Sequence, residues 1–271
     1  MESLDLNSFS EIRLPKFFKI RQKFKKDKIE NISYKIRGPI KPYIINLRNK
    51  RIAVGVGSRG IANINIITRT VVDSLKEEGA VPFIVPAMGS HGGSTESGQK
   101  EILASYGITE KSMGVSINAS MDVQVIGEYE PGLPVYISKS AISADGIVII
   151  PRIKPHTGFR GKVESGICKM LSIGLGKQMG ADSIHSKGFG RFSELIPGIG
   201  CMVAEKTNLL FALALVENAY DETCKIEFVT KDEIINLKKE EMLLEESRRL
   251  MGRILIPKFD VLVISEIGKN I

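Results

Sequence analysis

The sequence predicts an α/β fold in which a largely parallel, Rossmann-like sheet carries helices on both faces. Two observations lead to this prediction. From residue 52 onward, short apolar runs alternate with longer segments of helical period, as repeated βαβ units do. The apolar runs contain few polar residues, which is typical of parallel strands buried on both faces. A chain of 271 residues, 43% of them hydrophobic, is long and apolar enough to bury such a core.

The first βαβ unit is expected directly after residue 50. Residues 51–56 form an apolar run, and residues 62–78 carry apolar side chains at helical spacing up to Gly79, a residue that commonly ends helices. The expected elements that follow are a strand at 81–87, a helix at 95–106, strands at 123–126 and 135–137, and a strongly apolar central strand at 145–150.

The second half resumes this alternation after a glycine-rich stretch at 151–190. Its expected elements are a helix at 200–205, strands at 209–216 and 226–230, a long helix at 232–251 and a strand at 259–264. The first 50 residues combine short apolar groups with several prolines, which predicts strands and extended segments. We therefore expect a segment at 1–51 that packs on the main domain, and an α/β domain at 52–271.

The net charge of +7 is concentrated near the N-terminus. Residues 1–51 hold 14 Lys and Arg against 5 Asp and Glu, whereas residues 52–271 hold 24 against 26. This basic segment lacks a recognition helix, an RNA-binding aromatic signature and a long basic amphipathic helix, so neither nucleic acid nor a membrane is an expected partner. The sequence shows no signal-peptide pattern and no membrane-length apolar run. Its three scattered cysteines favour reduced thiols, and we expect a cytoplasmic protein.

The three histidines of the chain all lie in or near glycine-rich segments. His91 and His156 each follow a predicted strand, and His185 lies further on. In an open α/β sheet the loops that leave the carboxyl ends of strands form the ligand crevice. Imidazole moves protons near neutral pH, so His91 and His156 are candidates for a pair that exchanges acid and base roles.

A glycine-rich turn at 55–60 follows the first predicted strand. Gly55, Gly57 and Gly60 satisfy the GxGxxG dinucleotide fingerprint literally. The end of the next strand, however, has no carboxylate to bind a ribose. The turn, with Ser58 and Arg59, is therefore interpreted as an anion-binding turn before a helix; a glycine turn that permits close packing is the structural alternative.

The loop at 151–161 gathers positive charge around His156. It contains Arg152, Lys154 and Arg160, and Lys162 lies just beyond it. Arginine binds carboxylates through two parallel hydrogen bonds, and lysine binds phosphate or anchors a cofactor covalently. The sequence contains no Walker A, HExxH or GxSxG motif, which argues against a P-loop NTPase, a zincin and an α/β-hydrolase.

Together, these segments resemble the N-terminal domain of the nickel-dependent lactate racemase family. The motifs are Gly57-Ser-Arg-Gly60, Met88-Gly-Ser-His91, Lys154-Pro-His-Thr-Gly-Phe-Arg-Gly161, Lys169-Met-Leu-Ser-Ile-Gly-Leu-Gly176 and His185. The resemblance implies a racemase or epimerase of a small anionic 2-hydroxy acid. It also implies a nickel-pincer nucleotide cofactor, which is joined to a lysine by a thioamide and holds nickel through carbon, two sulfurs and a histidine.

The resemblance assigns a role to each candidate residue. Lys169 would carry the cofactor and His185 would bind nickel. His91 and His156 would transfer protons while a hydride leaves C2 of the substrate for the pincer carbon. Arg59 and Arg160 would bind the substrate, and residues Gly55, Gly57, Ser58 and Gly60 would cradle the cofactor. On this basis residues 52–271 are expected to be the cofactor-binding domain of the family, and the family's second, C-terminal domain is expected to be absent from this chain.

Alternatives remain beside this assignment. Val56 and Gly57 stand where the family has an acidic residue, and the segment between His156 and Lys169 is longer than in lactate racemases, so Lys162 is a rival for the lysine role. The competing functions are an NAD(P)-dependent oxidoreductase that uses the turn at 55–60, and a non-catalytic anion-binding module.

Overall fold

The computed structural model describes residues 16–266. Within this range the chain divides into a large compact unit, residues 25–252, and a small unit formed by residues 16–24 and 253–266. The large unit therefore begins well before residue 51, where the sequence suggested a boundary. Residues 25–51 belong to it because Ile32, Ile36, Ile40 and Ile44 are buried in its core.

The large unit is built on a five-stranded sheet in the order β2-β1-β5-β6-β7. Its strands are β1 (Arg51–Val56), β2 (Val81–Pro86), β5 (Gly146–Ile150), β6 (Leu209–Glu217) and β7 (Thr223–Thr230). The first four run parallel to one another, and β7 pairs antiparallel with β6 at one edge. The predicted largely parallel α/β sheet is confirmed.

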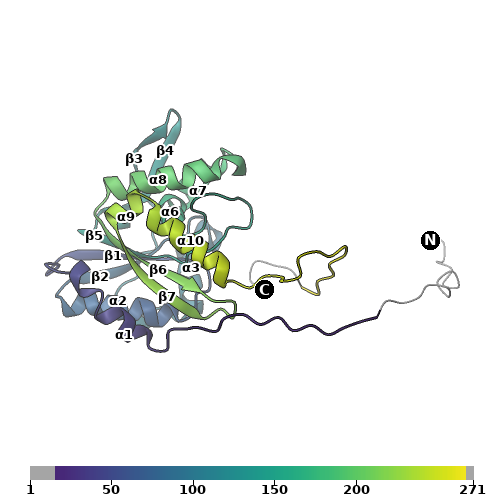
Figure 1. The fold of residues 1–271 in the computed structure, drawn as a ribbon. Coiled ribbons are helices and arrows are strands. Elements are labelled where there is room, and N and C mark those ends of the chain that lie inside the picture. Colours follow the sequence, from purple (N-terminus) through teal and green to yellow (C-terminus); the bar gives the residue numbers. More distant parts are fainter. Residues whose placement is uncertain (1–15, 267–271) are drawn as a thin grey trace. The chain divides into compact units, whose positions relative to one another are not determined.

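Alternate residues of each strand enter two separate cores, one on each face of the sheet. In β1, Ile52 and Val54 point to one face and Ala53 to the other; in β5, Val148 and Ile149 divide in the same way. Residues of both faces are buried because helices cover both sides. Figure 1 shows α1 and α2 on one side of the sheet and α8, α9 and α10 on the other.

The helices include all four expected ones and several that the sequence did not predict. They are α1 (Ile32–Arg37), α2 (Ile64–Glu77), α3 (Glu96–Ser105), α4 (Glu110–Met113), α5 (Lys139–Ile142), α6 (Ile167–Lys169), α7 (Lys177–His185), α8 (Phe192–Lys206), α9 (Lys231–Ile235) and α10 (Lys238–Leu250), with a π-helix, η4 (Met170–Gly174), and short 3-10 turns, η2 (Lys41–Tyr43), η3 (Gly92–Ser94) and η5 (Phe189–Arg191). In α2 the buried residues Ile67, Val71 and Leu75 repeat at intervals of four, so the helix presents one apolar face to the sheet.

The strands β3 (Val123–Glu130) and β4 (Leu133–Ser138) lie outside the main sheet. They form an antiparallel hairpin of their own, which contacts α7 and α8. The hairpin projects from the unit beside α8 (Figure 1). The sequence identified both segments as strands but did not show that they pair only with each other.

Several expected elements were wrong. Residues 16–50 contain α1 and a 3-10 turn rather than strands, because their buried isoleucines recur every four residues. The helix expected at 232–251 is divided into α9 and α10 at Leu237, whose φ of 62° is left-handed. Helix α8 begins earlier than expected and contains Pro197. Residues 259–264 form no strand: Val261 and Val263 are 78% and 89% exposed, and no neighbouring strand pairs with them.

None of the helices in the described residues 16–266 is both long enough and apolar enough to cross a lipid bilayer.

Candidate functional site

The carboxyl ends of the parallel strands place the predicted site residues along one edge of the sheet. The turn with Ser58 and Arg59 follows β1, the loop with His91 follows β2, and the loop with His156 follows β5. Since β1 pairs in parallel with both β2 and β5, these three connections leave the sheet at the same edge. This edge is where ligands bind in open α/β sheets.

The turn after β1 contacts His91 directly. The Ser58 hydroxyl is hydrogen-bonded to Nδ1 of His91, and the hydroxyl of Tyr106 donates to the Ser58 carbonyl at 2.6 Å. A Cβ at Gly55 would lie 3.0 Å from the Ile149 side chain, so this glycine permits close packing against β5. Two of the predicted residues, Ser58 and His91, are therefore neighbours.

The same turn differs from a dinucleotide fingerprint in its relation to the next helix. Helix α2 begins at Ile64, beyond Gly60, and the amide of Ala62 donates to the Glu217 carboxylate at 2.6 Å. Strand β2 runs into Ala87 and Met88 with no carboxylate. The protein's own carboxylate thus occupies the approach to α2, where the fingerprint would place a pyrophosphate.

A fully buried lysine holds the loop that carries His91. Nζ of Lys177 donates to the Pro86 carbonyl at 2.8 Å and to Oε1 of Gln99 at 3.0 Å. The Gln99 amide donates in turn to the carbonyls of Gly89, at 2.9 Å, and His91, at 3.3 Å. Burial lowers the pKa of Lys177 to about 8. The sequence did not identify this network, because Lys177 and Gln99 lie in helical segments where polar residues usually face solvent.

Lys169 lies at the end of α6, on a segment that packs against the turn after β1 and against the His91 loop. The segment continues into the π-helix η4, where Gly174 accepts a hydrogen bond from the amide of Gly89 at 3.0 Å. A Cβ at Gly57 would lie 3.7 Å from the Met170 side chain. Lys169 is half-buried, whereas its rival Lys162 is exposed. The segment of Lys169 therefore lies close to the glycine turn and to the His91 loop.

A buried carboxylate holds the start of this segment. Glu240 of α10 accepts a hydrogen bond from the amide of Cys168 at 3.1 Å. Only 1% of Glu240 is exposed, and this burial raises its pKa to about 7. A hydrogen bond with Cys201, burial and the charge of Glu240 raise the pKa of the Cys168 thiol, which makes Cys168 a poor thiolate.

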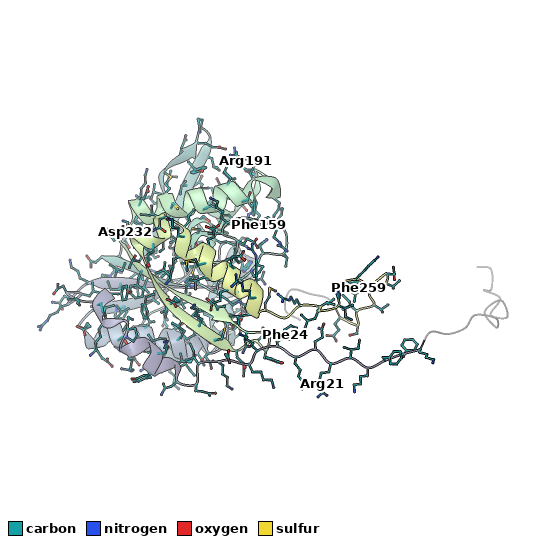
Figure 2. All side chains as sticks on the ribbon, in the orientation of Figure 1. Arg21, Phe24, Phe159, Arg191, Asp232 and Phe259 are labelled. Atoms are coloured by element: carbon teal, nitrogen blue, oxygen red, sulfur yellow. The ribbon has the colours of Figure 1, made fainter. Side chains whose placement is uncertain are left out.

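His156 and His185 meet at a cluster of three phenylalanines, Phe159, Phe189 and Phe192. The ring of His156 lies 4.5 Å from that of Phe159 and 6.5 Å from that of Phe189. His185, the last residue of α7, lies 6.0 Å from Phe189 and 5.1 Å from Phe192. Figure 2 labels Phe159 on the loop near α8, and its ring is 5.6 Å from that of Phe192. The cluster joins the His156 loop to the end of α7.

The buried side chain of Glu164 holds the His156 loop through backbone amides. Its buried carboxylate accepts the amides of His156, at 2.6 Å, and Gly161, at 3.2 Å, and it pairs with Arg248 of α10 at 2.6 Å. The Arg160 side chain is 68% exposed, donates to the His156 carbonyl and lies 3.7 Å from Glu164. The predicted substrate-binding role of Arg160 stays a prediction, and in this structure its guanidinium bonds to its own loop.

The ring of His185 has a defined tautomer. Nδ1 lies 2.5 Å from the Ala181 carbonyl, which can only accept, so Nδ1 carries the proton and Nε2 of the neutral ring keeps its lone pair. Histidines that bind metals characteristically donate their second ring nitrogen in this way. Residues 16–266 contain no group of three or more His, Cys, Asp or Glu able to hold a metal alone.

These contacts therefore gather the predicted residues into two groups. His91 lies with Ser58, close to the segment of Lys169, and His156 lies with His185 at the phenylalanine cluster. That all four line one cleft stays a prediction. Glu164, Lys177, Gln99 and Glu240 were missed by the sequence analysis.

The fold and this strand-end site define an α/β domain of the ligand-binding kind. Residues 18–184 match the family model of the lactate racemase N-terminal domain, so the chain belongs to this family. It is also similar in fold to the lactate racemase apoprotein from Thermoanaerobacterium thermosaccharolyticum, with a TM-score of 0.54, 20% identity and 75% of this chain covered. The match covers 51% of that protein, so this chain spans about half of its length. A comparison with curated proteins finds no match.

Proposed function

We propose that this chain is the cofactor-binding part of a racemase or epimerase that acts on a 2-hydroxy acid through a lysine-tethered nickel-pincer nucleotide. Membership of the lactate racemase N-terminal domain family supports an isomerase of this type. The structural observation that carries the proposal is the placement of Lys169. It stands on a segment that packs against the glycine turn and the His91 loop.

In this proposal Lys169 is the tether and His185 the nickel ligand. The Nε2 lone pair of His185 is available because Ala181 fixes the tautomer. Gly55, Gly57, Ser58 and Gly60 form the cradle for the cofactor. When bound, the cofactor would accept and return the hydride, which no side chain of the protein can do.

The protein's own residues would then bind the substrate and move its hydroxyl proton. Arg59 and Arg160 supply positive charge for its carboxylate. Nδ1 of His156 accepts the amide of Gly158 at 3.0 Å, so a neutral His156 carries its proton on Nε2. Nδ1 of His91 is held by Ser58. Nδ1 of each imidazole is thus engaged within its own site, and Nε2 is the nitrogen to which this proposal assigns proton transfer in a pair with alternating acid and base roles.

The test is the intact mass and nickel content of the chain produced together with the cofactor-building enzymes. The wild-type chain should gain the mass of the cofactor and bind nickel, and Lys169→Ala should gain neither. Lys162→Ala, in which an exposed lysine of the same region is lost, should behave as wild type. An undiminished mass increase in Lys169→Ala contradicts the assignment, and a loss confined to Lys162→Ala moves the tether to Lys162. His185→Ala should retain the mass increase and lose nickel.

A further inference from the structure

Two half-buried cations at the site edge, Arg59 and Lys154, are not hydrogen-bonded or ion-paired to any carboxylate of the described residues 16–266. Arg59 follows β1 and Lys154 follows β5, and these neighbouring strands are in register up to Val56 and Ile150. Neither side chain forms a hydrogen bond or an ion pair with any other residue in the described range 16–266. A charge that is partly removed from water is costly unless a partner compensates it.

The nearby Arg152 shows what a compensated cation looks like at this edge. Its guanidinium pairs with Glu217 of β6, and the two side chains are 16% and 6% exposed. The other oxygen of Glu217 accepts the amide of Ala62, at 2.6 Å. Glu217 is therefore committed to Arg152 and Ala62, and it ties the turn that carries Arg59 to the segment that carries Lys154.

The backbone of Lys154 is also fixed. Its amide donates to the Ser165 carbonyl at 2.9 Å, and its carbonyl accepts the Ser165 amide at 3.2 Å. Burial is the main cause that lowers the pKa of Lys154, and the charges of Arg152 and Arg59 lower it further, whereas Glu217 and Asp221 act in the opposite direction. Arg59 lies three residues beyond Val56 and Lys154 four residues beyond its register partner Ile150, so both chains leave the same edge of the sheet, and no carboxylate bonds to either side chain.

We propose that Arg59 and Lys154 together bind a doubly charged oxyanion, either two carboxylates of one small molecule or a phosphate group. The planar guanidinium of Arg59 suits one carboxylate or two phosphate oxygens, and the ammonium of Lys154 supplies a second point charge. Ser58, next to Arg59, contacts His91. This inference rests on the proposed function: if the chain serves a 2-hydroxy acid racemase or epimerase, the site selects a 2-hydroxy acid that carries a second anionic group.

The experiment is calorimetric titration of the complete, cofactor-free chain at low ionic strength with malate, lactate and inorganic phosphate. Malate should bind at least about tenfold more tightly than lactate, which is the effect of one additional charged hydrogen bond. Lys154→Met should remove this preference, and Lys154→Arg should restore it. Lys100→Met, which removes an exposed lysine of α3, should leave it unchanged.

The outcomes separate the two sources of the dianion. Malate binding more tightly than phosphate identifies a dicarboxylate, and the reverse order identifies a phosphate group. Equal binding of malate and lactate, or a wild-type preference in Lys154→Met, overturns the proposal. The thermal unfolding midpoint of each variant shows that it is folded. Since no cofactor is attached, failure here leaves the mass test of Lys169 unaffected.

Discussion

The loops that carry His91 and His156 are held in place by groups of opposite charge. Behind His91, the ammonium of Lys177 and the amide of Gln99 donate to backbone carbonyls of residues 86, 89 and 91. Behind His156, the Glu164 carboxylate accepts backbone amides of residues 156 and 161. Each loop thus presents a histidine at its exposed side and is fixed by a buried ionisable group at the other.

The difference lies in how each buried charge is compensated. Glu164 has the guanidinium of Arg248 as a partner, whereas Lys177 bonds to two neutral oxygens. Removing one member of a buried ion pair strongly destabilises the folded protein, because the other charge remains without its partner. A buried lysine without an anionic partner instead has a lowered pKa and responds to pH. The two loops should therefore fail under different conditions.

The largest expected effect comes from Glu164→Ala. It leaves two backbone amides and one guanidinium nitrogen of Arg248 without their buried acceptor, which should lower the free energy of unfolding by about 3 kcal/mol. Urea denaturation at pH 7 measures this change. The matched control is Glu245→Ala: Glu245 also pairs with Arg248, but it is 51% exposed, and its loss should cost under about 1 kcal/mol. Equal effects of the two substitutions would show that Glu164 does not hold the loop.

The intermediate effect is a pH-dependent one at Lys177. The pKa of Lys177 is about 8 in the folded chain, because burial lowers it, against 10.5 for a free lysine. The folded state therefore binds fewer protons, and wild-type stability rises with pH between these values. The stability advantage of wild type over Lys177→Met should be about 2 kcal/mol greater at pH 9.5 than at pH 7.

Urea denaturation of both proteins at the two pH values measures this difference. Lys206→Met is the control, because Lys206 is exposed and also donates to a backbone carbonyl, that of Ile126. Its effect should remain under about 1 kcal/mol at either pH. A stability advantage of wild type that is the same at pH 7 and pH 9.5 would mean that burial does not lower the pKa of Lys177.

The smallest effect is expected for Arg160→Ala. Arg160 is 68% exposed and lies 3.7 Å from Glu164, so the loss of this pair should change the free energy of unfolding by less than about 1 kcal/mol. The same denaturation experiment measures it. A loss as large as that of Glu164→Ala would mean that Arg160, rather than Arg248, compensates the buried carboxylate.

The sheet was predictable because its strands carry their own signal. Continuous apolar runs such as residues 146–150 occur where both faces of a strand are buried, and the sequence shows them directly. The strand expected at 259–264 shows the limit of that signal. Its residues are as apolar as those of a strand, but pairing depends on a neighbour elsewhere in the chain, which composition does not reveal.

The predicted site divides in the same way. The histidines could be found because they are few and follow predicted strands. Glu164 and Lys177 could not, because charged residues usually face solvent, and only the packed chain shows that their side chains are 0% exposed. The sequence analysis noted the charge of Lys154. It could not show that the carboxylate of Glu217, 63 residues further along the chain, pairs with Arg152 and leaves Lys154 without an ion pair.

Lys177 has a second consequence, through its main chain. Its φ of 55° turns the polypeptide sharply between the π-helix that follows Lys169 and the helix that ends at His185. The segment from Lys169 to His185 therefore contains two helices that change direction at Lys177. The side chain of the same residue holds the start of the His91 loop. An insertion or deletion at this joint would redirect three predicted functional groups at once, so the length of the segment should be far less tolerant of change than its surface composition.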